Sequence, residues 1–220
     1  MFQKSVCYYV FEVVYIKEAD MAGCIITISR EYGSGGRLIG QALAEQLKIP
    51  FYDRGLVEMI SEKSGLSEKF INEAELYREE AIKYAGYDVT LQMPLTHVVF
   101  HAEAEVISKI ADEGDCVIVG RCADYVLQDR KDVLNVFVYA SMENRLERIT
   151  KLYGDKVSNV KAFITRYDKD RAAYYDYYTD KKWGDLRSYH LSVNSDMGIN
   201  SCVEIIKTAY NNWKDGVQLV

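Results

Sequence analysis

The feature that most constrains the fold is a short apolar run followed directly by a glycine-rich loop and a helical pattern. Residues 24–28 form a β-branched run that predicts a buried parallel strand. The loop, residues 29–37, contains three glycines, and apolar residues then recur at helical spacing until the Lys-Ile-Pro of residues 48–50. A strand, a loop and a helix N-terminus in this order gather backbone N–H groups and the positive end of a helix dipole. We therefore expect the loop to bind phosphate.

Short apolar runs alternate with helical patterns along the rest of the chain. Further strands are expected at residues 51–52, 116–119, 133–139 and 190–193, and further helices at 56–63, 67–84, 95–113, 142–152, 159–173 and 199–213. No strand pattern occurs from residue 56 to 113, which indicates a helical insertion. Strands that alternate with helices predict an α/β fold with a five-stranded parallel sheet and a ligand site at the carboxyl ends of the strands.

The composition is that of one globular domain. We place this domain at residues 24–220 of the 220-residue chain, after an N-terminal extension at residues 1–23 that Glu12 makes too interrupted for a membrane span. The net charge of −6 disfavours nucleic-acid binding. Five cysteines without C-x-x-C spacing favour reduced thiols and a cytoplasmic location. Eighteen tyrosines favour amphipathic packing, with the hydroxyl reaching a partner or water, over a base-stacking platform.

The loop departs from the nucleotide-binding pattern G-x-x-x-x-G-K-[ST] in either register. If the pattern ends at Gly35, Arg30 stands at the first glycine and Gly36 at the lysine. If it ends one residue later, Arg37 stands at the lysine and Leu38 at the hydroxyl position. Arg37 can replace the lysine charge, although a planar guanidinium differs from a compact ammonium group.

Two other interpretations of the loop remain open. Ser34 or Ser29 can supply the missing hydroxyl of the phosphate-binding loop. The first alternative is a tight strand-to-helix turn that binds no ligand. A dinucleotide-binding turn is the other alternative, because Asp53 follows the glycines at a distance that suits a ribose-binding acid. Against this alternative, the third glycine of G-x-G-x-x-G would fall at Leu38.

Four segments carry a resemblance to a known family. They are residues 28–37, 51–55, 119–125 and 166–171. In order and spacing they resemble the cytidylate kinase-like branch of the P-loop nucleoside monophosphate kinases, over about residues 24–210. The resemblance implies a P-loop NTPase-type three-layer fold, a helical acceptor-binding insertion at about 55–113 and a lid at about 154–183. It also implies ATP and Mg²⁺ as cofactors and nucleotides as substrates; the Mg²⁺ ligands and the oligomeric state stay open.

The resemblance assigns three groups of site residues. The ATP phosphates would be bound by Ser29, Arg30, Gly33, Ser34, Gly35, Gly36 and Arg37. The acceptor would be bound by Asp53, Arg54, Gly120 and Arg121. Catalytic charge would come from Arg37, Arg166 and Arg171, with Asp170 orienting the lid arginines. A solvated turn at Arg54, a structural Arg121 and a salt-bridged surface helix at 159–173 are the alternatives.

The expected activity is ATP-dependent phosphoryl transfer to a nucleoside monophosphate, with CMP as the acceptor that the family suggests. Arg54 replaces a hydroxyl residue of true cytidylate kinases, and Cys122 replaces an acid. Two alternatives follow: a nucleotide-binding sensor or interaction module with impaired catalysis, and a kinase for another small phosphorylated acceptor.

Overall fold

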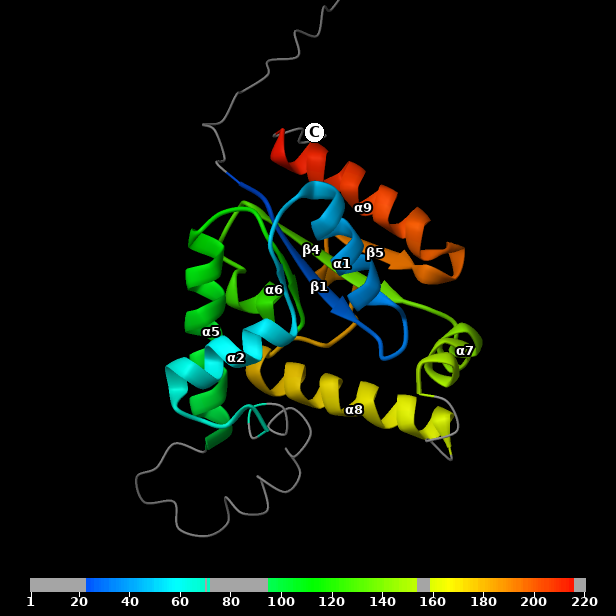
Figure 1. Cartoon of the computed structure of the whole chain (residues 1–220), viewed down its shortest axis with the longest axis horizontal. Helices are drawn as coiled ribbons and strands as arrows, with labels where there is room; N and C mark the ends of the chain where they lie inside the picture. The colour runs from blue at the N-terminus through cyan, green and yellow to red at the C-terminus, as the bar shows by residue number, and fades with distance from the viewer. Residues whose placement is uncertain (1–22, 70, 72–94, 154–158, 216–220) are drawn as a thin grey trace, which may run out of the picture.

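The computed structural model describes residues 23–69, 71, 95–153 and 159–215 (Figure 1). Its centre is a sheet of five strands, in the order β2-β3-β1-β4-β5. The strands are β1 (Ile25–Arg30), β2 (Phe51–Tyr52), β3 (Val117–Val119), β4 (Val133–Tyr139) and β5 (Leu191–Asn194). All four neighbouring pairs are parallel. The predicted five-stranded parallel sheet is confirmed.

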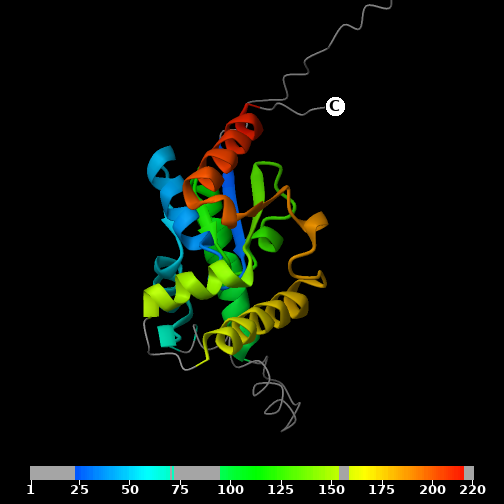
Figure 2. The same cartoon turned by 90° about the vertical axis from the view of Figure 1, so that its right-hand side faces the viewer.

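Helices cover both faces of the sheet (Figures 1 and 2). One face carries α1 (Gly36–Leu47) and α9 (Ile199–Lys214); the other carries α2 (Arg54–Ser64), α5 (Leu95–Asp112) and the short α6 (Ala123–Val126). Two further helices, α7 (Met142–Tyr153) and α8 (Val160–Thr179), pack together, and α8 lies across the carboxyl ends of the strands in Figure 1. Two 3₁₀ turns, η2 (Leu186–Ser188) and η3 (Ser195–Met197), flank β5. The result is a three-layer α/β fold.

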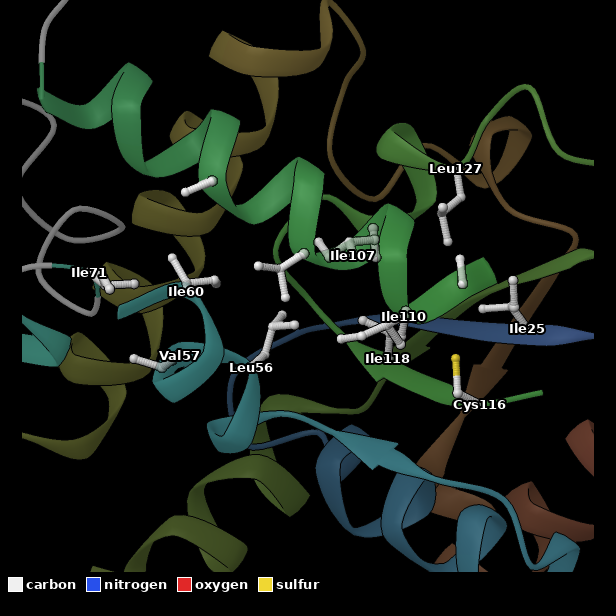
Figure 3. Packing of buried hydrophobic residues seen from close by; sticks show 14 of the residues in the cluster. Ile25, Leu56, Val57, Ile60, Ile71, Ile107, Ile110, Cys116, Ile118 and Leu127 are labelled. Carbon is white, nitrogen blue, oxygen red and sulfur yellow. The ribbon is translucent and has the colours of Figure 1, made fainter. Parts of the chain in front are cut away.

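The alternation of side chains along β1 divides the core between the two faces. Ile26 and Ile28 are fully buried against α1 and α9, whereas Ile25 faces the cluster formed with α2 and α5. Figure 3 shows this second cluster, to which Leu56 of α2 and Ile107 of α5 both belong. Because β1 is buried on both faces, its position is fixed, and so is the start of the loop that follows it.

Two element boundaries differ from the sequence-based prediction. β1 extends to Arg30, so Ser29 and Arg30 belong to the strand rather than to the loop. Helix α8 does not end at residue 173 but runs to Thr179, because Tyr174 and Tyr175 are buried by the rest of the domain. Tertiary burial there overrides the weak helix propensity of tyrosine.

Some predictions fall wholly or partly outside the described residues. These are the extension at 1–22, most of the helix expected at 67–84 and residues 154–158 of the lid. The helices expected at 56–63 and 95–113 are confirmed as α2 and α5, but the insertion and lid as functional units stay predictions. Among the described residues, no helix combines the length and apolar character that crossing a bilayer requires.

Candidate phosphate-binding site

The glycine-rich loop makes a tight turn from β1 into α1. Gly33 has a φ of 79° and Gly35, the N-cap of α1, a φ of 84°, a backbone conformation that favours glycine. The first N–H groups of an α-helix have no acceptor within the helix, so those of Gly36 and Arg37 can bind an anion. Ser34 between the glycines is fully buried, and its Oγ donates to the Glu31 carbonyl at 2.8 Å.

Three side chains from distant segments hold the loop by its carbonyl groups. Arg145 and Arg148 of α7 donate to the carbonyl oxygens of Tyr32 and Gly33, at 2.7 and 2.5 Å. Ser195 of η3 donates to the carbonyl oxygen of Ser34 at 2.5 Å. The N–H of a trans peptide points away from its own carbonyl oxygen. The carbonyl of Tyr32 shares a peptide unit with the N–H of Gly33, and the carbonyl of Ser34 shares one with the N–H of Gly35. Because these two carbonyls are anchored, the two N–H groups point to the opposite side.

The sequence analysis missed these three anchoring residues. Arg145 and Arg148 are three residues apart on one helix, which places them on the same face, and that spacing was the available signal. Ser195 offered no local signal, because its contact joins segments 161 residues apart.

Helix α8 also contacts the loop. Asp168 accepts a hydrogen bond from the Tyr32 N–H at 2.7 Å and forms an ion pair with Arg145. Arg171 donates to the carbonyl oxygen of Arg30 at 3.1 Å, and its guanidinium carbon lies 5.3 Å from the centre of the Tyr32 ring. Asp168, which the sequence analysis did not select, therefore ties the loop to α8 and α7.

The predicted lid residues have unequal positions. Arg171 lies at the loop, whereas Arg166 is 74% exposed and has only a 3.9 Å contact with Asp170 among its described ion pairs. The structure thus places one predicted lid arginine at the glycine-rich loop and the other in solvent.

Glu31 adds a carboxylate to the same network. It accepts from the Ala140 N–H at 3.2 Å and lies 3.2 Å from an Arg145 nitrogen. Burial raises the pKa of Glu31, while the Ala140 N–H and the positive charge of Arg145 oppose that rise. Arg145 is thus held by two carboxylates and one carbonyl, which fixes its orientation.

Arg37 and Asp53 meet at the other end of the loop. They form an ion pair at 2.5 Å, although the Arg37 side chain is 49% exposed. Asp53 is the N-cap of α2, whose first residue is Arg54. The structure brings Arg37 and Asp53, both predicted site residues, into contact; the side chain of Arg54 lies outside what it describes.

Arg121 lies in an unusual turn after β3. Gly120, Arg121 and Cys122 all have positive φ values, of 80°, 57° and 53°. Non-glycine residues with such angles are uncommon, and they cluster at functional sites. The Gly120 N–H donates to the Ile28 carbonyl at 3.0 Å, which fixes the turn beside β1.

The side chain of Arg121 is bound in the interior. It pairs with Glu103 of α5 at 2.6 Å, and Glu103 is fully buried. The Tyr174 hydroxyl donates to the other Glu103 oxygen at 2.6 Å. Burial, and then the negative charge of Glu103, raise the pKa of Tyr174 well above its usual value. Glu103, a residue the sequence analysis did not single out, is thus a buried partner of Arg121, the kind of contact that the alternative of a structural Arg121 implies.

Tyrosines of α8 behave as the sequence analysis expected. Tyr175 donates to Asp124 at 2.6 Å, and burial raises the pKa of that aspartate. Tyr178 stacks on Phe100 of α5, with ring centres 4.3 Å apart. Tyr175 therefore bonds through its hydroxyl, and Tyr178 packs through its ring.

A groove in the described part of the chain lies away from the glycine-rich loop. A groove of about 660 Å³ runs along α5 and α6, lined by Lys63, Phe100, His101, Ala104, Glu105, Ser108, Lys109, Asp112, Tyr125, Val126 and Gln128. None of its lining residues belongs to the glycine-rich loop. In the described part of the chain, no group of three His, Cys, Asp or Glu side chains could hold a metal ion.

Comparison with known proteins identifies related sequences and folds. A family model described as the cytidylate kinase-like family matches residues 25–197. No curated protein matches the chain. The crystal structure of an uncharacterized protein from Eubacterium ventriosum ATCC 27560 has a TM-score of 0.63 at 24% identity, covering 86% of this chain and 98% of that one.

Two further structures share the fold at lower identity. Shikimate kinase from Bacteroides thetaiotaomicron has a TM-score of 0.50 at 16% identity, over 86% of this chain and 98% of its own. TT1252 from Thermus thermophilus has a TM-score of 0.52 at 12% identity, over 86% and 97%. At these identities the likeness shows a shared α/β fold and leaves the activity to the site itself.

Proposed function

Because the chain belongs to the cytidylate kinase-like family, we propose that it transfers the γ-phosphoryl group of ATP to a nucleoside monophosphate, with CMP as the first acceptor to test. One observation carries the proposal: the anchored loop and the Arg121 turn follow β1 and β3, which are neighbours in the sheet. Neighbouring strands lie about 4.8 Å apart. A donor and an acceptor phosphate held at these two strand ends would therefore be close together.

The chemistry needs positioning and positive charge more than proton transfer. The donor phosphates would lie on the N–H groups of Gly33, Gly35 and Gly36, and the acceptor phosphate near Arg54 and Arg121. An oxygen of the ionised acceptor phosphate forms the new bond to the γ-phosphorus. The bond from that phosphorus to the bridging oxygen breaks, and its electron pair leaves with ADP. No general base is required, because the attacking oxygen carries no proton.

Several charged residues would stabilise the negative charge in transit. Arg171 lies at the loop, and Arg37 at the junction of the loop with α2. Arg166 would have to move from its exposed position to reach the phosphates, with Asp170 guiding it. Mg²⁺ bound to ATP would neutralise phosphate charge; kinases commonly hold this ion through substrate oxygens, water and one or two protein ligands, so a three-residue cluster is not needed.

Cys122 favours a second candidate function. It stands where the resemblance places an acid next to the acceptor-binding arginine, so recognition of the cytosine ring lacks that group. A different small phosphorylated acceptor is therefore the alternative. The departures of the loop from the usual nucleotide-binding pattern leave a nucleotide-binding module without turnover as a third outcome.

An acceptor screen tests these candidates. Release of ADP from MgATP is measured with each nucleoside monophosphate and with a set of small sugar and alcohol phosphates. We expect the fastest release with CMP. A preference for a non-nucleotide phosphate would replace CMP with that acceptor, and tight ATP binding without ADP release on any acceptor would leave only the binding module.

Arg121 variants test the acceptor half of the site. Arg121→Lys keeps the charge but loses the planar fork, so we expect the acceptor KM to rise about tenfold while ATP affinity stays within about twofold. Arg121→Ala should raise this KM further. An unchanged acceptor KM in both folded variants would remove Arg121 from the acceptor site.

A further inference from the structure

The two departures of the loop from the G-x-x-x-x-G-K pattern lie in contact with each other. In the register that ends at Gly35, an arginine stands at the first glycine position and a glycine stands at the lysine position. A Cβ atom placed on Gly36 would lie 2.6 Å from Cβ and 3.1 Å from Cγ of Arg30. The stem of Arg30 therefore passes over Gly36 and fills the space that the first carbons of a lysine there would need.

A second glycine fits the other end of the same side chain. A Cβ atom on Gly120 would lie 2.8 Å from Cζ of Arg30 and would overlap its Nη1 atom. Gly120 follows β3 and comes directly before Arg121. The guanidinium of Arg30 thus lies against the turn that leads to the proposed acceptor site, while its stem crosses the start of α1.

The backbone around Arg30 is fixed on both sides. Arg30 is the last residue of β1 and pairs with Val138 of β4, and its carbonyl accepts from Arg171 of α8. The two glycines leave the space that the Arg30 side chain occupies, since a Cβ atom at either position would collide with it. Such packing is expected of a side chain whose charged group has to be held at one position.

We propose that Arg30 and Gly36 are an exchanged pair, in which Arg30 supplies from the end of β1 the phosphate-binding cation that a lysine at position 36 supplies in the usual pattern. This inference rests on the proposed kinase function and deepens it. In the usual order, glycine comes first and the cation six residues later; here the cation comes first and the glycine makes room for it. The guanidinium would contact the phosphoryl group between the donor loop and the Arg121 turn.

The exchange explains why the loop lacks the usual lysine, and it does so without requiring that catalysis be lost. A lysine ammonium presents a compact charge, whereas a guanidinium presents a planar fork that can bind two phosphate oxygens at once. Positive charge at the transferring group is the largest requirement of phosphoryl transfer, and either side chain meets it. The missing lysine is then no sign of an inactive binding module.

A swap of the two residues tests the proposal. Arg30→Met keeps the stem and removes the charge, and we expect kcat with MgATP and the best acceptor to fall about 100-fold. Gly36→Lys alone should also be impaired, because its side chain collides with Arg30. The double variant, Arg30→Gly with Gly36→Lys, restores the usual order, and we expect its kcat to return to within about tenfold of the wild type.

Controls keep the outcomes distinct. Arg187→Ala removes an exposed cation of η2 and should leave kcat unchanged, and thermal unfolding of every variant reports whether it folds. If Arg30→Met does not fold, Arg30→Gln replaces it, because it also removes the charge, and it should lower kcat by a similar factor. A folded double variant no more active than the weaker single variant would overturn the exchange, as would full activity of Arg30→Met.

Failure of the kinase proposal would be recognisable separately. If the wild type transfers no phosphoryl group to any acceptor, the same variants are compared by their affinity for MgATP in calorimetry. We expect Arg30→Met to weaken binding about tenfold and the double variant to recover it. Equal affinity of the wild type and Arg30→Met would contradict the exchange whatever the enzyme does.

Discussion

The first half of α8 meets the glycine-rich loop through charged groups and through two aromatic rings, Phe163 and Tyr167, whereas its second half meets α5 and the Arg121 turn through buried tyrosines. On the loop side, Asp168 binds the Tyr32 N–H and the buried Arg145, whereas Arg166 is 74% exposed. On the other side, Tyr174 is buried and donates to Glu103, which is fully buried.

The difference implies that the exposed contacts of α8 can be broken at a lower cost in free energy than its buried contacts. Contacts between partly exposed charges are weakened by salt and change with protonation. Buried, fully bonded polar groups are costly to separate, because each partner would be left without its hydrogen bond. We therefore expect the exposed Arg166–Asp170 contact to respond to ligands, salt and pH, and the buried contacts of Arg145 and Glu103 to act as the fixed part of the domain.

The largest expected effect is on the buried acceptor side. Glu103→Ala removes the counter-charge of Arg121 and the acceptor of the Tyr174 hydroxyl, and breaking a buried pair from one side costs about 3 kcal/mol or more. We expect this loss in the free energy of unfolding, measured by urea denaturation. Glu105→Ala is the matched control on the same helix, because Glu105 is 62% exposed and pairs only with Lys63 among its described ion pairs. Equal losses in the two variants would break the distinction between a buried and an exposed side.

An intermediate effect is expected at the loop. Asp168→Asn keeps an oxygen for the Tyr32 N–H but weakens the hold on Arg145, whose guanidinium orients the loop carbonyls. We expect the affinity for MgATP, measured by calorimetry, to fall by about tenfold, which corresponds to the loss of one charged hydrogen bond. Asp176→Asn in the second half of α8 is the control, since Asp176 caps the Trp183 N–H away from the loop. An ATP affinity unchanged by Asp168→Asn would show that α8 does not position the loop.

The smallest expected effect is a pH dependence at Glu31. Because burial raises its pKa in the folded protein, the stabilising contribution of Glu31 is present below the unfolded pKa and is lost as pH rises through the folded pKa. Above that range the ionised carboxylate costs stability. We expect Glu31→Gln to match or exceed the wild-type stability at pH 7, by less than about 1 kcal/mol, and to lose this advantage near pH 4. A variant that is less stable than the wild type at pH 7 but not at pH 4 would reverse the sign.

The sequence predicted the parts of the fold that depend on local patterns. The apolar runs of β1, β3 and β4 are short and continuous, which is how buried parallel strands differ from helices, and the glycines marked the loop between β1 and α1. The order of the strands did not follow from those runs, because the register of a parallel sheet depends on contacts between distant segments.

The residues that hold the site were less predictable. Glu103 sits two residues from the exposed Glu105 on the same helix, and nothing local distinguishes the buried glutamate from its neighbour. Asp168 was passed over in favour of Asp170 because its partners, Tyr32 and Arg145, lie 136 and 23 residues away. The match of Arg30 with Gly36 and Gly120 likewise depends on three segments that only the fold brings together.

The most direct test of the account is the fate of the γ-phosphoryl group in a single turnover. Excess enzyme is mixed with ATP labelled in its γ-phosphate, Mg²⁺ and a pool of nucleoside monophosphates, and the products are separated after rapid quenching. The account predicts that the label moves to an acceptor and that ADP forms at the same rate. Label that stays on ATP, or that appears as inorganic phosphate at a rate independent of the acceptors, would contradict it.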